Sequence, residues 1–238
     1  MEKLFVAIFL IAVVVATVAI QPETGITADD LDMSNLSGVN DRKKRFFDFM
    51  RPIINDENSK ILKLREQLLA AKEHNNNKVF VARMAKQYSV SWDHENKNWD
   101  KLFERVDVIA LELSLAQSAV ETAWGQSRFA RQGNNFFGQW CYPKGCGIIP
   151  AKRNRGSSHE VAKFNSVNDS VRSYIKNINT GRVYALLRKV RRENRSAGKQ
   201  PDAKAQAGGL IKYSQRGKKY VKEIRAIIHA NKKLMLGQ

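Results

Sequence analysis

One stretch of this chain constrains the fold more than any other, because it has the pattern of a helix that is apolar on nearly every side. From about residue 102 or 106 to residue 124 the side chains are mostly Ile, Leu, Val and Ala, and Gly125 follows as a C-cap. Gln117 and Glu121, four residues apart, form a narrow polar track on one face. A helix that is hydrophobic all round lies inside a domain. We therefore expect a central buried helix whose polar track faces a cleft or a buried network.

Glu121 is the single carboxylate near the end of this helix. Apolar surroundings disfavour the charged form of a carboxyl group, so its pKa rises and it can carry a proton near neutral pH. A general acid needs this property in order to protonate a glycosidic oxygen. The alternative is a surface glutamate or a structural ion pair, because buried ion pairs also occur without a catalytic role.

The N-terminal twenty residues form a separate segment. Residues 4–20 are apolar apart from Thr17, a run that is long for a secretory signal and at the lower limit for a membrane span. Thr17-Val18-Ala19 is a fair cleavage site, so residues 1–20 are predicted to be either a signal peptide or an uncleaved N-terminal membrane anchor. Both alternatives imply that the rest of the chain is exported.

The rest of the chain divides into three parts by its pattern. Residues 21–40 show little apolar periodicity and are expected to be a linker. Residues 41–100 are expected to be a helical extension, and residues 101–238 to be the main domain with basic C-terminal helices. The predicted fold class is α+β and mostly helical, with a small β-hairpin lobe.

Local patterns place the individual elements. Apolar residues recur at helical spacing over residues 58–74 and 79–88, and Asn75-Asn76-Asn77 separates the two runs. Short alternating runs around a polar turn predict a β-hairpin within residues 139–165. Capping-box spacing over residues 166–169 predicts the start of a further helix. Helical patterns then continue to the C-terminus, with a break at 198–209.

The net charge of +18 is unevenly distributed, since residues 186–238 contain fifteen Lys and Arg but three acids. A basic face of this kind favours polyanions. For an exported protein the expected partners are an anionic wall polymer or lipid headgroups, and a solvated helical face is the alternative. No nucleic-acid-binding motif accompanies the charge, so nucleic acid is not an expected partner.

Two cysteines, Cys141 and Cys146, flank a short turn that contains Pro143 and Gly145. Outside the reducing cytosol this spacing favours a disulfide. No second cysteine pair accompanies them, and the four histidines show no ligand spacing. We therefore expect neither a metal site nor a cofactor.

Three ordered motifs carry a resemblance to a known family. They are Ala116-Gln117-Ser118-Ala119-Val120-Glu121-Thr122-Ala123-Trp124-Gly125, Ser127-Arg128-Phe129-Ala130 and Asn134-Asn135-Phe136-Phe137-Gly138. Together they resemble the glucosaminidase family of peptidoglycan hydrolases, to which flagellar and staphylococcal autolysin domains belong. The resemblance covers about residues 100–230, including Tyr213-Ser214-Gln215-Arg216-Gly217 followed by Tyr220-Val221.

The resemblance implies a lysozyme-like α+β fold that cleaves the β-1,4 bond after N-acetylglucosamine in peptidoglycan, with Glu121 as the acid. We also expect a monomer in the periplasm, whose partner is the glycan strand of peptidoglycan. One departure is Ala123, where the family usually has glycine. A methyl group beside the cleft would narrow a sugar subsite.

The second catalytic group is left open by the sequence. Glu160 lies in the predicted hairpin, where the family places a mobile second acid; it would act as base or nucleophile, unless it is an exposed hairpin residue beside Lys163. Asp169 competes with it, but a capping role is favoured for Asp169. In a third alternative the N-acetyl oxygen of the substrate attacks, and Tyr184, similar to a tyrosine near the family's cleft, orients it. A packing role for Tyr184 is the alternative.

The predicted substrate-binding residues surround the acid. They combine amides, which can bond sugar hydroxyl and acetamido groups, with aromatic rings on which sugars can stack, and they are Gln117, Trp124, Asn134, Asn135, Phe137, Trp140 and Tyr142. Asparagine pairs also shape turns, and Phe137 also suits a core position.

Other functions compatible with the sequence use the same cleft differently. A lytic transglycosylase needs one catalytic glutamate and forms an anhydro sugar without water. A wall-binding or scaffold protein would keep the cleft without turnover. The context Glu121-Thr122 and Trp124-Gly125 favours the hydrolase.

Overall fold

The computed structural model describes residues 25–93, 95, 97–151, 156 and 158–238. The predicted signal or anchor at residues 1–20 lies outside them. Within these residues no helix has both the length and the apolar character needed to cross a membrane. The fold is α+β and mostly helical, as the sequence predicts, with η1 (Ala28–Asp30), α1 (Val39–Glu73), α2 (Lys78–Gln87), α3 (Trp99–Arg105), α4 (Leu111–Thr122), α5 (Arg128–Gly133), β1 (Trp140–Cys141), β2 (Gly147–Ile148), β3 (Glu160–Ala162), α6 (Val167–Thr180), η2 (Arg182–Tyr184), α7 (Ala185–Ser196), α8 (Ala203–Gly208) and α9 (Lys218–Leu236).

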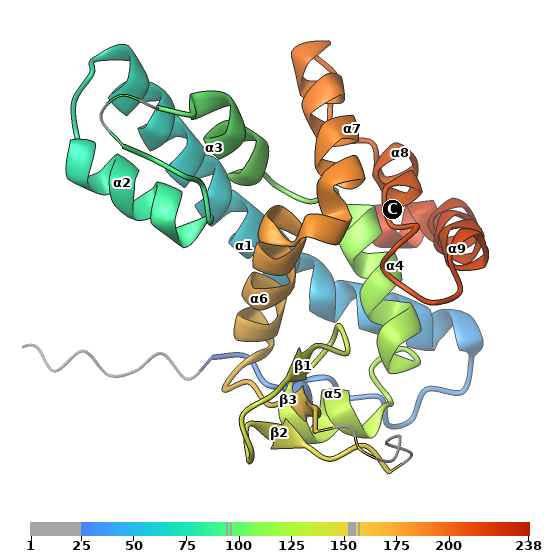
Figure 1. The fold of residues 1–238 in the computed structure, drawn as a ribbon. Helices are drawn as coiled ribbons and strands as arrows, with labels where there is room; N and C mark the ends of the chain where they lie inside the picture. The colour runs from blue at the N-terminus through green and yellow to red at the C-terminus, as the bar shows by residue number, and fades with distance from the viewer. Residues whose placement is uncertain (1–24, 94, 96, 152–155, 157) are drawn as a thin grey trace, which may run out of the picture.

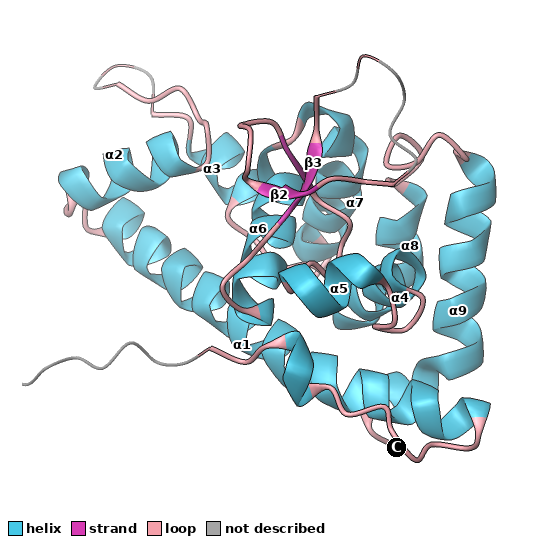
Figure 2. Cartoon of the chain, turned by 90° about the horizontal axis from the view of Figure 1, so that it is seen from below, coloured by secondary structure: helices cyan, strands magenta, loops and turns pink. Residues whose placement is uncertain are grey.

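The long helix α1 spans the molecule. It runs past α4, α6 and α9 and reaches α2 at its far end, as Figures 1 and 2 show. Its 35 residues correspond to about 50 Å. Phe46, Phe47 and Ile54 on its first half are fully buried in the same core cluster as Leu113 of α4 and Ile224 of α9. The first part of the predicted helical extension therefore shares the core of the main domain.

The central helix predicted from about residue 102 or 106 is two helices in the structure, α3 and α4. The backbone between them leaves helical geometry because side chains from distant elements bind its polar groups. The Ile109 N–H donates to the Asn58 side chain at 3.3 Å, and the Ala110 N–H donates to the Gln206 side chain at 3.1 Å. Arg191 donates to the Asp107 carbonyl. These long-range bonds fix where α4 starts.

Helix α4 ends two residues earlier than the sequence predicts. Its C-cap is Ala123, which has the left-handed backbone conformation at φ 49°, and Trp124 and Gly125 follow with φ of 62° and 81°. Glycine adopts this region without the steric cost that a Cβ atom brings. The structure thus gives a physical reason for a glycine preference at position 123. Ala123 is exposed and is not among the residues that line the cleft described below.

The predicted hairpin is part of a three-stranded antiparallel sheet in the order β1-β3-β2. Cys141 pairs with Glu160 across β1 and β3, and Ile148 pairs with Val161 across β2 and β3. The predicted disulfide between Cys141 and Cys146 is present and closes the turn between β1 and β2. This small lobe packs beside α5 (Figure 1).

The second half of the chain supplies the helices around α4. Ser166 caps α6 by accepting the Asp169 N–H at 3.1 Å, as the capping-box spacing predicts. A short helix, α8, lies within the predicted break at 198–209, because Asp202 caps it and Ala207 is fully buried. Helix α9 then packs along α4, α1 and α8.

The segment before α1 is docked on the domain over part of its length, although residues 21–40 are predicted to be a linker. The Ala28 N–H donates to the Asn134 side chain at 2.7 Å. The Val167 N–H donates to the Ile26 carbonyl at 2.7 Å. The segment is therefore fastened beside α5 and the start of α6.

Candidate active site

A cleft of about 730 Å³ opens at the C-terminal end of α4. Its walls come from α4, the loop before and including β1, α6, η2 and the loop before α9. The residues that line it are Glu121, Phe137, Gly138, Gln139, Trp140, Tyr142, Ser173, Lys176, Asn177, Thr180, Tyr184, Tyr213 and Ser214. Among these described lining residues, Glu121 is the one with a carboxyl group.

The two oxygens of Glu121 have different surroundings. Oε1 accepts a hydrogen bond from the Tyr220 hydroxyl at 2.9 Å. Oε2 lies beside Gly138, where an added Cβ atom would be 3.4 Å from it. Gly138 has φ of 63°, so its turn favours glycine for a conformational reason as well. One oxygen is thus held by a phenol, while the other faces a backbone position without a side chain.

Burial raises the pKa of Glu121 above its ordinary value. The hydrogen bond from Tyr220 and the charge of Arg216 act in the opposite direction, and the charge of Glu223 adds to the rise. Arg216 and Glu223 form an ion pair at 2.7 Å. The environment therefore favours the protonated form of Glu121, as its apolar sequence context predicts.

A buried chain of hydrogen bonds orients Glu121. The Tyr174 hydroxyl donates to Oε1 of Gln117 at 2.7 Å, and Nε2 of Gln117 donates to the Tyr220 hydroxyl at 3.1 Å. Tyr220 then donates to Glu121, so the chain has one direction from α6 through α4 to α9. Gln117 is fully buried. Its geometry suits the positioning of the acid, and it is not among the residues that line the cleft.

Stacked aromatic rings fix the walls around this chain. Phe137 stacks on Tyr174 with ring centroids 3.8 Å apart, and Tyr213 stacks on Tyr220 at 5.2 Å. The Tyr213 hydroxyl donates to the Phe137 carbonyl at 3.3 Å, which joins the two stacks. Because aromatic stacks are rigid, the groups that they carry are held in place before a substrate arrives.

Tyr184 also lines the cleft, with its ring centroid 6.0 Å from that of Tyr213. It is 8% exposed, and burial raises the pKa of its phenol. Gly181 packs against its ring so closely that an added Cβ atom would lie 2.9 Å from it. The phenol therefore remains protonated at neutral pH and has a fixed ring orientation.

Trp140 and Tyr142 project from the β lobe and are 59% and 68% exposed. Trp140 stacks on His159 with ring centroids 3.9 Å apart. Both aromatic residues line the cleft, and the disulfide of Cys141 and Cys146 lies directly beside them. They present apolar surface to the cleft at its β-lobe side.

Glu160, the residue predicted as a second acid, lies in β3 of the β lobe, as the hairpin prediction places it. It is 5% exposed, its Oε1 accepts the Gly145 N–H at 3.0 Å, and its Oε2 accepts the Gly147 N–H at 2.8 Å. Glu160 is not among the residues that line the Glu121 cleft. Its carboxylate spans the disulfide turn instead of lying beside Lys163 as an exposed hairpin residue.

Three further predicted substrate-binding residues lie outside the cleft lining. The Asn134 side chain donates to the Phe164 carbonyl at 2.9 Å, and Asn135 is almost fully buried and bonds the backbone at Gln139. Trp124 packs edge-on against Phe47 of α1 at 5.4 Å. In these contacts the two asparagines shape turns and Trp124 covers the core.

Sequence reasoning assigned no role to Tyr174, Tyr220 or Lys176. Tyr220 bonds the acid from a position 99 residues away in the sequence, a contact that no local pattern reveals. Its place in the C-terminal motif was the one available signal. The side chain of Lys176 lines the cleft, but its amine donates to the Gln87 carbonyl and lies 3.9 Å from the centre of the Tyr88 ring.

A metal ion has one candidate ligand group among the described residues. Cys141, Cys146 and Glu160 bring ligand atoms within 4.8 Å of one another. The two sulfur atoms are bonded to each other, so neither is a thiolate, the form in which cysteine binds metals. With the disulfide formed, this group does not fit a metal site.

Comparisons with known proteins identify the family of the chain. Residues 96–233 match the Glucosaminidase family, described as mannosyl-glycoprotein endo-beta-N-acetylglucosaminidase. The chain is similar to Protein bax of Escherichia coli (strain K12), with 32% identity over 200 residues that cover 82% of this chain and 71% of that protein. The sequences at 137–141 and 213–221 resemble the Bax proteins of Gram-negative bacteria, and this similarity confirms the resemblance. No solved structure matches the chain significantly.

Proposed function

Because the chain belongs to the glucosaminidase family, we propose that it is a peptidoglycan hydrolase that uses Glu121 as its general acid. The bond cleaved is the β-1,4 bond after N-acetylglucosamine, so the enzyme is an endo-β-N-acetylglucosaminidase. The observation that carries this proposal is the position of Glu121: its pKa is raised by burial, one oxygen is held by Tyr220, and the other lies beside Gly138.

The chemistry follows from this arrangement. Protonated Glu121 donates its proton to the glycosidic oxygen as the bond from that oxygen to the anomeric carbon breaks. The leaving sugar departs as an alcohol, and positive charge develops at the anomeric carbon. In the route favoured below, the acetamido oxygen of the substrate bonds to this carbon as the leaving sugar departs. Water then attacks the carbon and breaks that bond, while Glu121, now a carboxylate, accepts the proton of the water. The hydrogen-bond chain through Gln117 and Tyr220 keeps the carboxyl group in one orientation during both transfers.

For the second catalytic group we favour the substrate's own acetamido oxygen. Glu121 is the one carboxyl group among the described residues of the cleft, and both oxygens of Glu160 already accept backbone N–H groups. The buried phenol of Tyr184 lies in the cleft wall and can orient the acetamido group. We assign Glu160 the role of holding the turn that carries Tyr142 and Cys146.

We assign the remaining wall positions to sugar binding. Trp140 and Tyr142 offer exposed aromatic surface, and Phe137 supports Tyr174 from the cleft side. The proposal does not extend to Trp124, Asn134 or Asn135, whose contacts lie elsewhere.

We propose that the chain acts in the periplasm as a monomer and that residues 4–20 direct its export or anchor it. The exposed cations of α9, among them Lys218, Lys222 and Lys233, would retain it on anionic wall polymer or lipid headgroups. Retention of this kind should weaken steeply with salt, and binding to wall material that is equal at low and high salt would contradict it.

The single-carboxylate cleft also suits a lytic transglycosylase, which is the second candidate function. In that reaction a hydroxyl of the substrate takes the place of water. The two reactions leave different sugar ends, so product analysis separates them.

Mass spectrometry of peptidoglycan digested by the purified full chain tests the proposal. We expect fragments that end in reducible N-acetylglucosamine, absent when Glu121→Gln is used and present with Glu112→Gln, a matched change on the same helix. Anhydro-muramic ends would establish the transglycosylase. No cleavage over a range of pH and salt would favour a wall-binding protein that keeps the cleft without turnover.

A further inference from the structure

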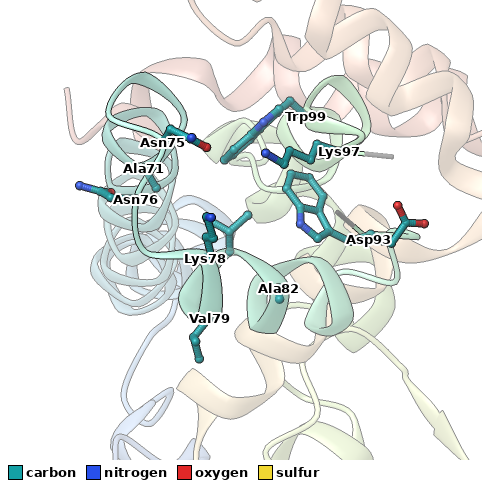
Figure 3. A pocket seen from close by; sticks show the side chains of 11 residues that line it. Ala71, Asn75, Asn76, Lys78, Val79, Ala82, Asp93, Lys97 and Trp99 are labelled. Carbon is teal, nitrogen blue, oxygen red and sulfur yellow. The ribbon is translucent and has the colours of Figure 1, made fainter. Parts of the chain in front are cut away.

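A second groove, of about 470 Å³, lies at the opposite end of α2 from the Glu121 cleft. Three parts of the chain line it: the C-terminal end of α1 with the turn that follows, the first part of α2, and the four residues Trp92, Asp93, Lys97 and Trp99. Figure 3 shows the side chains of Asn75 and Lys78 across the open space from Trp99 and Lys97. None of these residues belongs to the site described above.

The two tryptophans of this groove are held rigidly. Trp92 and Trp99 meet edge to face, with ring centroids 4.9 Å apart and planes at 88°. Trp99 also stacks on Phe103 at 5.6 Å, and a backbone bridge between Trp92 and Lys97 closes the loop that carries them. Both indoles are partly exposed. The groove therefore presents aromatic surface of fixed orientation to solvent.

Polar side chains surround the two tryptophans of the groove. The Asn75 side chain is exposed and has no hydrogen-bond partner among the described residues, and its backbone has the left-handed conformation at φ 47°. Lys78 and Lys97 add two ammonium groups. Indole surface combined with amide and ammonium donors matches one face of a sugar ring, where C–H groups pack on the indole and acetamido and hydroxyl oxygens accept hydrogen bonds.

We propose that this groove is a non-catalytic binding site for a glycan strand of N-acetylated amino sugars. The inference rests on the proposed function, because the polymer assigned to the groove is the same polymer that the cleft would cut. It is a separate binding event, however, and can be measured without turnover.

The position of α2 supports a shared polymer. Lys78 and Ala82 at its first turns line the groove, whereas the Gln87 carbonyl at its end accepts the amine of Lys176, whose side chain lines the cleft. The ten residues of α2 correspond to about 15 Å. A strand of several sugars can reach both sites, and two linked contacts raise the retention of a polymer above that of either site alone.

The four tryptophans of the chain allow a direct test. Trp92 and Trp99 report on the groove, Trp140 reports on the cleft, and Trp124, packed on α1, is an internal reference. We would titrate isotope-labelled full chain, carrying Glu121→Gln to prevent turnover, with the hexamer of N-acetylglucosamine. The indole N–H signals, assigned by Trp→Phe variants, are recorded by NMR.

The inference predicts that the Trp92 and Trp99 signals move with the hexamer while the Trp124 signal does not. Ala82→Gln puts a longer side chain at the groove wall. It should weaken the hexamer affinity that the Trp92 and Trp99 signals report about fivefold, which corresponds to a loss of roughly 1 kcal/mol of binding free energy. It should weaken the Trp140 response less than the groove responses, because the cleft keeps its own contacts and loses only the contribution of the linked groove. Ala230→Gln, the same change at an exposed position of α9, should alter neither.

The contrary results distinguish a failure of the groove proposal from a failure of the cleft proposal. Movement of Trp140 alone would leave the cleft proposal standing and would overturn the groove. Movement of Trp92 and Trp99 alone would support the groove while the proposed substrate of the cleft failed. An oligonucleotide or an apolar peptide that moved the groove signals at lower concentration than the hexamer would overturn the glycan assignment, as would an unchanged response in Ala82→Gln.

Discussion

Glu121, which is partly exposed, and Glu160, which is buried, have carboxyl groups with different hydrogen-bond surroundings. At the end of α4, one oxygen of Glu121 accepts a phenol and the other lies beside the open turn at Gly138. In the β lobe, the two oxygens of Glu160 accept the N–H groups of Gly145 and Gly147. A carboxyl group with one oxygen hydrogen-bonded to the protein can exchange a proton with a ligand through its other oxygen. A carboxyl group with both oxygens bonded to backbone N–H groups holds that backbone in place.

The largest expected effect comes from Glu121→Gln. It removes the proton donor, so kcat should fall by about 10³-fold, within the range that general acid catalysis supplies. Burial raises the pKa of Glu121, so ionisation of this group costs folding free energy as the pH rises through that pKa. The variant should therefore be at least as stable as the wild type at neutral pH. Initial rates on purified peptidoglycan and thermal unfolding measure both quantities.

Two findings would contradict the catalytic role proposed for Glu121. A Glu121→Gln variant with wild-type rates would remove Glu121 from the chemistry. A large loss of stability would show that the carboxyl group has a structural role, as the Glu160 carboxylate is proposed to have.

Glu160→Gln should have the next largest effect, and a different kind of effect. A glutamine has one acceptor oxygen for the two backbone N–H groups, so one of them is left unpaired at a cost of about 1–3 kcal/mol in unfolding free energy. Loosening of the turn should lower activity about tenfold, equivalent to roughly 1.4 kcal/mol of transition-state stabilisation. Chemical denaturation and rate measurements test this, with Glu66→Gln on the exposed face of α1 as the control.

Azide distinguishes the two possible roles of Glu160. A small external nucleophile can replace a missing catalytic carboxylate, but it cannot replace two bonds to the backbone. We expect Glu160→Ala to gain no activity from sodium azide. Rescue by azide would identify Glu160 as the second catalytic group and would overturn its assignment to the turn.

Tyr220→Phe should have a smaller effect on activity, and it tests whether Tyr220 controls the pKa of Glu121. The hydrogen bond from Tyr220 lowers the pKa of Glu121, so its removal should raise that pKa further. Activity requires the protonated acid and falls as the pH rises through this pKa, so the alkaline limb of kcat/KM should move to higher pH. The loss of orientation should reduce the maximal rate several-fold. Tyr88→Phe, at a buried tyrosine outside the network, should leave the limb in place.

Ala123→Gly should have the smallest effect, on stability alone. Because Ala123 has a left-handed backbone, glycine should stabilise the fold by about 0.5–1 kcal/mol. The same change at Ala226, an exposed position inside α9, should destabilise by about 1 kcal/mol. Chemical denaturation measures both. A clear change in KM for Ala123→Gly would instead support the idea that this methyl group narrows a sugar subsite.

The sequence was most informative where contacts are local. Helical periodicity predicted α2, the cap at Ser166 predicted the start of α6, and the apolar context of Glu121 predicted the direction of its pKa shift. The disulfide followed from spacing and compartment. In each case the deciding interaction lies within a few residues of the pattern that reveals it.

Long-range contacts account for what the sequence did not reveal. The break before α4 depends on Asn58 and Gln206, which lie far from it in the chain. The partner of Glu121 is Tyr220, and the partner of Trp124 is Phe47. Residue type alone suggested sugar binding for Trp124, because an indole serves a core and a sugar site equally well.

The docking of residues 25–31 has a mechanical consequence. A pull on the chain ahead of Gly25 would load the bonds from Ala28 to Asn134 and from Val167 to Ile26 before it reached α1. Asn134 also holds the Phe164 carbonyl, just beyond β3. Tension from a tether would therefore be transmitted first to the base of the β lobe, which forms one jaw of the cleft. Force applied there would act on the β lobe and on the first turn of α6 before it reached α4, the helix that carries Glu121.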